Sequence, residues 1–265
     1  MVANPMVNQG SALIVTSLAN AKALGIPPER YVYFVGGAAA EEPRDYLQRD
    51  TYTESHAQNA VLHEVMKFVG GDGTKFDAIE LYSCFPCVPK MARRTLGFGP
   101  DIQPTVTGGL TFFGAPLNCY MAHAACSMVR RVRDGAQHAL LYGQGGFVTK
   151  HHAIVLSPKQ PTEPLSENTS VQAAADAQRK AAPKFDADAS GKASVESFTV
   201  IYDRKGDVDH GVVILRTAGN DRTLARVPAD DKPTLARLLD MERTPIGASG
   251  IIGKAADGMQ EWKAA

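Results

Sequence analysis

The chain has 265 residues, of which 44% are hydrophobic and 21% charged, a composition typical of globular rather than disordered proteins. Basic and acidic residues balance at 28 each, so the net charge does not indicate a nucleic-acid footprint or a basic membrane patch. The longest apolar runs, such as Val212 to Leu215, are far shorter than the roughly 20 residues that cross a bilayer. We therefore expect small-molecule or protein partners, no nucleic acid and no membrane span.

The N-terminal sequence MVANPMVNQGSALIV has no basic segment ahead of an apolar core, so it does not look like a secretory signal. All four cysteines lie between Cys84 and Cys126, which is too clustered for a secreted disulfide framework. These two observations predict reduced thiols in a cytoplasmic protein.

Short β-rich runs alternate with helical patterns as far as about Leu156, which indicates α/β layers around a buried sheet. Ala12 to Thr16 is predicted to be a strand. Ser17 is predicted to be the N-cap of a short helix that stops before Gly25. The next strand is predicted at Tyr31 to Val35.

A longer helix is predicted over about Glu54 to Val69, because apolar residues recur there at helical spacing. Ala78 to Tyr82 follows as a strand. A further helix is predicted to begin at Pro116, since an apolar stripe runs from there to a basic C-terminal end. Two last strands are predicted at Ala139 to Tyr142 and Ala153 to Leu156.

The composition changes after residue 157 to Pro, Ala, Lys, Gln, Glu and Asp, as in an exposed linker, although Val171 to Arg179 favours a helix. We predict a first domain at 1–157, a linker at 158–193 and a small β domain at 194–265. The last domain is short enough for a little barrel. Its predicted elements are strands at Val195 to Tyr202, Gly211 to Leu215 and Arg222 to Val227, a helix near Thr234 to Met241, and weak strands near Ile251.

Three glycine- or cysteine-bearing segments follow strands of the first domain, where open α/β sheets commonly place ligand sites. Each of them taken alone is compatible with a simple turn. In chain order they are Tyr82-Ser83-Cys84-Phe85, the loop with Gly108-Gly109 and Gly114-Ala115-Pro116, and Leu141-Tyr142-Gly143-Gln144-Gly145-Gly146.

The order and spacing of these segments resemble the C-terminal half of the thiolase superfamily, over about residues 1 to 157. In that family a strand ends in Asn-Glu-Ala-Phe or, in the sterol-carrier type, His-Asp-Cys-Phe. A glycine pair, four residues and Gly-His-Pro follow, and then a strand enters a glycine loop that in many members contains a cysteine. The opening from Asn8 to Ala12 also resembles the family's entry into this half.

A divergent branch of thiolase-like proteins, often named acetyl-CoA acetyltransferases, carries an extra C-terminal β domain, and the chain from about Ala193 resembles that addition. The resemblance implies an α/β fold: a thiolase-type C-terminal layer of mixed sheet and helices, followed by a small, mostly-β, barrel-like domain. It also implies an acyl-CoA acyltransferase in lipid metabolism, with a coenzyme A thioester as substrate and no bound cofactor.

The sequence departs from the family at the positions that carry catalysis. A thiolase needs a cysteine nucleophile within reach of the Gly-His-Pro histidine. Ala115 stands at that histidine position, and Tyr142 stands at the position of the second cysteine. Met1 falls in what resembles the middle of a longer protein. The resemblance thus leaves the catalytic residues unassigned and implies an N-terminal half, in the same or a separate chain, within a homo- or hetero-oligomer.

Two alternatives stay open: a non-catalytic module that binds CoA esters or acts as a scaffold, and an incomplete gene product. Other side chains are candidates for compensating the lost histidine, although core packing or tight turns explain each of them equally simply. The candidate pocket residues are Tyr82, Ser83, Gly109, Gly114, His123, Gln144 and Gly145.

We predict no metal site. Cys84 and Cys87 form a CxxC pair, but Cys119 and Cys126 lack the paired spacing that would complete a zinc site. The neighbouring His151 and His152 are expected to point to opposite faces of a strand, which makes them poor joint ligands.

Overall fold

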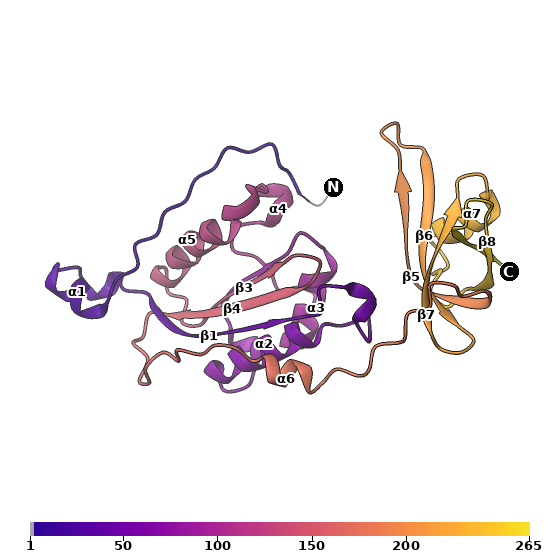
Figure 1. Cartoon of the computed structure of the whole chain (residues 1–265). Helices are drawn as coiled ribbons and strands as arrows, with labels where there is room; N and C mark the ends of the chain where they lie inside the picture. Colours follow the sequence, from indigo (N-terminus) through magenta and orange to yellow (C-terminus); the bar gives the residue numbers. More distant parts are fainter. Residues whose placement is uncertain (1–2) are drawn as a thin grey trace. The chain divides into compact units, whose positions relative to one another are not determined.

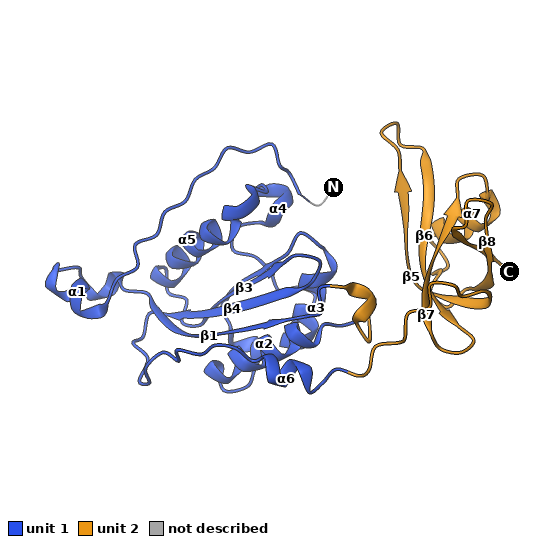
Figure 2. Ribbon diagram, in the orientation of Figure 1, with its two compact units in different colours: residues 1–44, 53–179 blue, residues 45–52, 180–265 orange. Residues whose placement is uncertain are grey.

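The computed structural model describes residues 3–265 and divides them into two compact units (Figures 1 and 2). Unit 1 contains residues 53–179 and the chain up to residue 44, and unit 2 contains residues 45–52 and 180–265. Met1, where the resemblance places the middle of a longer protein, lies outside the described residues. No helix in residues 3–265 is long and apolar enough to cross a membrane.

A mixed sheet forms the centre of unit 1, with its strands in the order β1-β4-β3-β2. β2 and β3 are parallel, whereas β4 runs antiparallel to both β1 and β3. The parallel pair requires the long crossover between β2 and β3, which contains three of the helices. The strands are β1 (Tyr33–Glu41), β2 (Ala78–Tyr82), β3 (Ala139–Gly145) and β4 (Lys150–Ser157).

Helices cover both faces of this sheet, which gives three layers (Figure 1). On one face, α2, α3 and α6 pack over a core that contains Leu140 and Tyr142 of β3. On the other face, α5 and α4 pack over a core that contains Leu141. The helices are α2 (His56–Met66), α3 (Cys87–Leu96), α4 (Gly109–Phe112), α5 (Tyr120–Arg133) and α6 (Gln172–Asp176).

The helix prediction around residue 18 is confirmed: α1 (Leu18–Ala23) begins after Ser17, whose hydroxyl accepts a hydrogen bond from the Asn20 amide. The strand prediction for Ala12 to Thr16 is wrong. This segment is extended, but no strand within residues 3–265 pairs with it. Ile14 is 95% exposed and Val15 70% exposed. A β-strand needs a neighbour to pair its backbone groups, and the described chain supplies none here.

Most remaining predictions in unit 1 are confirmed with shifted boundaries. β2 has the predicted limits, while β1, β3 and β4 are longer than predicted. The helix predicted from Glu54 begins after Ser55, whose side chain caps it, and ends in a 3-10 turn. The short 3-10 helices are η1 (Pro28–Arg30), η2 (Tyr46–Gln48), η3 (Lys67–Val69), η4 (Gly73–Lys75) and η5 (Leu117–Cys119).

Unit 2 is the predicted small barrel: five strands close in the order β5-β6-β7-β9-β8. Trp262 is fully buried at its centre, and α7 packs against the barrel through Leu235 and Leu238. The elements are β5 (Gly191–Tyr202), β6 (Val208–Thr217), β7 (Arg222–Pro228), α7 (Lys232–Leu239), β8 (Ser249–Lys254) and β9 (Gln260–Ala264).

The segment 45–52 belongs to unit 2 because Arg222 holds it there. The guanidinium of Arg222, which is fully buried, donates to the carbonyl oxygens of Leu47 at 2.5 Å and Arg49 at 2.6 Å. It also pairs with the carboxylate of Glu196 at 2.8 Å and lies over the ring of Tyr52. The chain passes from one unit to the other at residues 179 and 180, within the predicted linker 158–193. The exact domain boundaries stay a prediction.

Candidate functional site

Three of the predicted site residues, Tyr82, Gln144 and Gly145, line one cavity of about 370 Å³. We call it the β3–α5 pocket, because residues of β3, β4 and α5 form most of its wall. It lies where β2 and β3 end, as the strand-end argument predicts. Its wall consists of Tyr82, Met121, Ala125, Leu141, Gly143, Gln144, Gly145, Lys150, His152 and Ile154.

Tyr82 is the last residue of β2, and its ring stacks on Tyr120 with the ring centroids 4.6 Å apart. Its hydroxyl lies 3.4 Å from Sγ of Cys84. Burial raises the pKa of Tyr82 well above its usual value, and the hydrogen bond with Cys84 acts in the same direction. The phenol therefore keeps its proton at neutral pH and is a hydrogen-bond donor in the pocket wall.

Gln144 shapes the pocket by holding two loops together. Its Oε1 accepts a 2.7 Å hydrogen bond from the hydroxyl of Ser83, so Ser83 positions Gln144 without itself lining the pocket. Its Nε2 donates to the carbonyl oxygens of Gly145 at 2.5 Å and Gly146 at 2.9 Å. Because these bonds occupy the amide, its role is structural.

Gly109 and Gly114 lie in the glycine loop away from the pocket wall. Gly114 has φ +111°, and a Cβ at this position would lie 2.5 Å from a methyl carbon of Val7. The backbone here bonds the N-terminal arm, since the Ala115 amide donates to the carbonyl of Asn4 at 2.8 Å. The glycine loop therefore packs against the N-terminal segment and binds its backbone.

A buried carboxylate, which the sequence analysis missed, fixes the start of the same loop. Glu80 is 1% exposed, and its Oε1 accepts a 2.8 Å hydrogen bond from the hydroxyl of Tyr120. Its Oε2 accepts bonds from the Thr105 hydroxyl at 2.8 Å and the Val106 amide at 3.0 Å. Burial, followed by the charge of Glu80, raises the pKa of Tyr120 above its usual value. In the sequence, Glu80 stands among apolar residues of a predicted strand, and this pattern could have indicated a buried carboxylate.

Ala115 and Tyr142, which the sequence resemblance aligns with the family's histidine and second cysteine, do not line the pocket. Ala115 packs as a partly buried apolar residue beside α5. Tyr142 is fully buried on the opposite face of the sheet, where its hydroxyl lies 2.6 Å from Nδ1 of His151 and accepts from Gln58 at 2.8 Å. Burial raises the pKa of Tyr142.

His123 lies on α5 outside the pocket wall and is 7% exposed. Its Nε2 is 3.5 Å from Sγ of Cys119, and its ring meets that of Phe113 with centroids 5.5 Å apart. The structure therefore pairs this predicted residue with a thiol instead of placing it beside Tyr82.

Lys150 and His152 line the pocket, and the sequence analysis did not select them. Alternate residues of β4 face alternate sides, so Lys150 and His152 lie on the pocket face while His151 is fully buried on the other. The predicted opposite orientation of the two histidines is confirmed. Strand alternation counted from Lys150 would have indicated a cation and an imidazole on one face.

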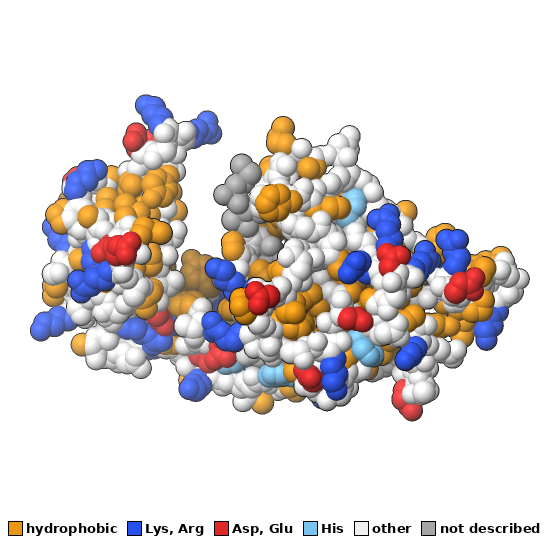
Figure 3. Space-filling view, turned by 180° about the vertical axis from the view of Figure 1, so that it is seen from behind, with side chains coloured by type: hydrophobic (Ala, Val, Ile, Leu, Met, Phe, Trp, Pro, Cys, Tyr) orange, Lys and Arg blue, Asp and Glu red, His pale blue; other side chains and the backbone are white. Residues whose placement is uncertain are grey.

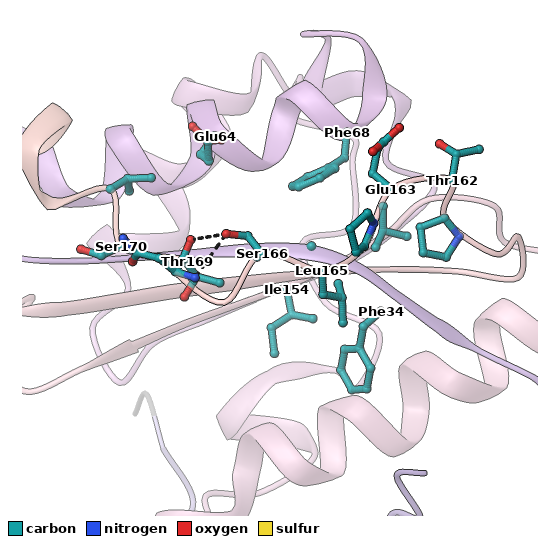
Figure 4. A pocket seen from close by; sticks show the side chains of 17 residues that line it. Phe34, Glu64, Phe68, Ile154, Thr162, Glu163, Leu165, Ser166, Thr169 and Ser170 are labelled. Carbon is teal, nitrogen blue, oxygen red and sulfur yellow. Dashed lines mark hydrogen bonds between the residues drawn. The ribbon is translucent and has the colours of Figure 1, made fainter. Parts of the chain in front are cut away.

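A larger cavity of about 710 Å³ lies between β1, the end of α2 and the loop 161–171, and contains none of the predicted site residues (Figure 4). Its wall is largely apolar: Phe68 lies above the strands, while Phe34 and Ile154 lie below (Figure 4). Glu163 and Ser166 are on the loop side. Within residues 3–265, no group of three or more His, Cys, Asp or Glu side chains is arranged to hold a metal ion.

Comparisons with known proteins agree with this architecture. Residues 171–257 match the family model described as "thiolase-like protein type 1 additional C-terminal domain". A monomeric SCP2-thiolase-like protein type 1 from Mycobacterium smegmatis is similar in structure, with a TM-score of 0.80 and 30% identity over 94% of this chain. This chain covers 54% of that protein, about half its length.

An acetyl-CoA acetyltransferase from Bacillus anthracis has a TM-score of 0.42 and 17% identity, covering 53% of this chain and 33% of its own. A comparison with curated protein sequences found no match. The motif order in unit 1, the additional C-terminal barrel and the likeness to the Mycobacterium protein point to one family. The chain belongs to the thiolase superfamily, in its sterol-carrier-related branch.

Proposed function

We propose that the chain is the C-terminal part of a thiolase-like acyltransferase and that it holds coenzyme A thioesters in the β3–α5 pocket. The observation that carries the proposal is the convergence of Tyr82, Lys150 and His152 on one cavity at the end of β3. A volume of about 370 Å³ falls within the range of small-molecule sites. The resemblance supplies the substrate class, and the pocket supplies groups that suit it.

Three parts of a CoA thioester have a matching group in the wall: the carbonyl oxygen, a phosphate, and the acyl chain or pantetheine arm. The protonated phenol of Tyr82 is a donor for the thioester carbonyl oxygen. The ammonium of Lys150 pairs with a phosphate. Met121 and Leu141 offer apolar surface to the acyl chain or the pantetheine arm. His152 is the imidazole of the pocket wall and is the candidate for proton transfer once the site is complete.

An N-terminal half is part of this proposal because unit 1 exposes apolar surface in the described chain. Besides Ile14 and Val15 on the unpaired arm, Phe112 is 89% exposed and Leu117 81% exposed. Hydrophobic side chains are visible among the charged ones on the surface of unit 1 (Figure 3). Contiguous exposed apolar residues commonly mark a protein interface. A second half, in the same or a separate chain, would pair the arm and cover α4.

Binding of acetyl-CoA to the purified chain, measured by isothermal titration calorimetry, tests the pocket. Lys150→Ala is expected to weaken binding roughly two- to fivefold, as the loss of an exposed ion pair does. Lys159→Ala, which removes an exposed lysine outside the pocket, is the matched control. Equal affinities for the two variants, or no binding by the unaltered chain, would contradict the proposal.

Ala115 favours a second candidate, a module that binds CoA esters without catalysis. The two candidates separate when the chain is co-purified with a candidate N-terminal-half polypeptide and assayed for CoA-dependent cleavage of a 3-ketoacyl-CoA. Turnover that His152→Ala abolishes supports the acyltransferase. A stable complex that binds acetyl-CoA without turnover supports the binding module.

A further inference from the structure

Cys119 and His123 bring a thiol and an imidazole together at the start of α5. Cys119 is the N-cap of this 14-residue helix, and His123 lies one turn further along. The distance from Sγ to Nε2 is 3.5 Å. His123 is 7% exposed, so its ring is buried beside the thiol. We propose that Cys119 and His123 form a nucleophilic pair that accepts an acyl group from a thioester.

This pair is separate from the β3–α5 pocket, so the inference goes beyond the proposed function. Successive residues of an α-helix are about 100° apart, which places Cys119 and His123 within about 40° of each other. Met121 and Ala125, which line the pocket, lie on roughly the opposite side of α5. An acyl group on Cys119 would therefore occupy a second site on this chain.

The thiol is reachable from the surface while the imidazole is held in place. Cys119 is partly exposed, and Leu117, two residues before it, is 81% exposed with φ +55°, a conformation that leucine rarely adopts. The ring of Phe113 packs against the imidazole. Strained backbone beside a reactive group recurs at functional sites, which agrees with the assignment.

The local hydrogen bonds suit removal of the thiol proton. Sγ of Cys119 lies 3.4 Å from the carbonyl oxygen of Pro116 and 3.5 Å from Nε2 of His123, so the S–H has two acceptors when Nε2 is unprotonated. Carbonyl oxygen does not take up a proton at neutral pH, whereas imidazole does. His123 is therefore the base of the pair.

The acyl-transfer step balances without an added reactant. Sγ of Cys119 attacks the carbonyl carbon of the thioester, and its proton passes to Nε2 of His123. The new sulfur–carbon bond forms as the bond to the departing thiol breaks, and His123 returns the proton to the departing thiolate. The products are an S-acyl Cys119 and a free thiol.

The start of α5 also suits the charge that develops in this step. No side-chain hydrogen bond caps the start of α5, which follows directly on the 3-10 helix η5. The helix N-terminus favours negative charge on the attacking sulfur.

The chain contains its own control thiols. Cys126 lies seven residues further along the same helix and is also partly exposed, but its Sγ bonds the carbonyl oxygen of Ala12 at 3.4 Å instead of an imidazole. Cys84 and Cys87 are exposed. Exposure alone therefore predicts that Cys84 and Cys87 react fastest, whereas the proposed pair predicts Cys119.

The test incubates the full chain with the acetyl thioester of N-acetylcysteamine at neutral pH and follows acetylation of each cysteine by peptide mass spectrometry. We expect Cys119 to be acetylated at least about tenfold faster than Cys126. His123→Gln is expected to slow Cys119 by a similar factor, with the rates at Cys84 and Cys87 unchanged. Cys119→Ala removes the fast phase, and Cys126→Ala keeps it.

Equal rates at Cys119 and Cys126 in the unaltered chain would overturn the inference, even if His123→Gln fails to fold. A fast Cys119 whose rate does not change in a folded His123→Gln variant would overturn the role of His123. The probe carries no nucleotide and does not require the β3–α5 pocket. A negative result in the acetylation test therefore does not bear on the calorimetric test of CoA-thioester binding. Likewise, a negative calorimetric result does not bear on acetylation of Cys119.

Discussion

The hydroxyl of Tyr142 lies 2.6 Å from Nδ1 of His151, across the antiparallel pair β3 and β4 on the face of the sheet that α2 and α3 cover. The sequence resemblance aligns Tyr142 with the second cysteine of many thiolases. In this chain that position is part of a buried polar cluster with Gln58 and Ser55, since Ser55 Oγ is 3.2 Å from Nε2 of His151. The position therefore stabilises the fold instead of serving the pocket.

Tyr142→Phe tests this structural role. The substitution removes the hydroxyl that accepts from Gln58 and bonds His151, leaving buried polar groups without that partner. We expect the free energy of unfolding of unit 1 to fall by about 1–3 kcal/mol. Urea denaturation followed by circular dichroism measures it. Tyr33→Phe, on β1 of the same sheet, is the control and should change stability by less.

Glu42 predicts a dependence of stability on acidic pH. Burial alone raises the pKa of Glu42, but hydrogen bonds from the Ala57 amide and the Ser55 hydroxyl, with the charge of Arg179, outweigh it and lower the pKa. A lowered folded-state pKa gives stability that is present above the unfolded-state value of about 4.3 and is lost as pH falls through the folded value.

Thermal unfolding measured across this acidic range checks the dependence. Glu42→Gln is expected to reduce the slope of stability against pH, because the substituted amide does not titrate. Glu29→Gln, on the short η1 turn, serves as a control carboxylate. An unchanged slope in Glu42→Gln would show that other carboxylates control the acid transition.

Arg222 is expected to stabilise unit 2. Arg222→Ala leaves the partly buried carboxylate of Glu196 with Arg216 as its remaining ion-pair partner and frees the carbonyl oxygens of Leu47 and Arg49. We expect a loss of about 1–3 kcal/mol in the free energy of unfolding of unit 2, as for lost hydrogen bonds to charged groups. Limited proteolysis should also cleave residues 45–52 faster. Arg204→Ala, in an exposed turn, should change neither measurement.

Tyr82→Phe tests the donor assigned to the pocket. The phenyl ring retains the shape needed to stack on Tyr120 but removes the O–H, so acetyl-CoA affinity is expected to fall about two- to tenfold. Because burial raises the pKa of Tyr82, the unaltered phenol stays protonated, and the Tyr82-dependent part of the affinity should be constant between roughly pH 6 and 9. An affinity difference between the unaltered chain and the Tyr82→Phe variant that disappears toward about pH 9 would contradict this.

Local sequence patterns predicted many of the elements, because caps, turns and apolar spacing act within a few residues. Ser17 as an N-cap and Ala78 to Tyr82 as a strand are examples. α3, which begins at the second cysteine of the CxxC pair, was not predicted, although Val88, Ala92 and Leu96 recur at four-residue spacing. Ala12 to Thr16 has strand composition, but pairing depends on a neighbour that local sequence does not specify.

The site was less predictable, because it depends on contacts between distant segments. The sequence motifs predicted Tyr82, Gln144 and Gly145 as pocket residues. Lys150 and His152 line the same cavity because the pairing register of β3 with β4 places them there, and the motifs did not indicate this. The pairing of Cys119 with His123 depends on where α5 begins, and sequence analysis placed that start only approximately.

The most direct test of CoA-thioester binding is an NMR titration with acetyl-CoA of the chain labelled at its amides and its methionine methyl groups. We predict that the amides of Gly143 and Gly145 and the methyl group of Met121 shift together along one binding curve, and that Lys150→Ala moves this curve to higher ligand concentration. Saturable shifts confined to residues outside the β3–α5 pocket, or none at millimolar acetyl-CoA, would contradict it.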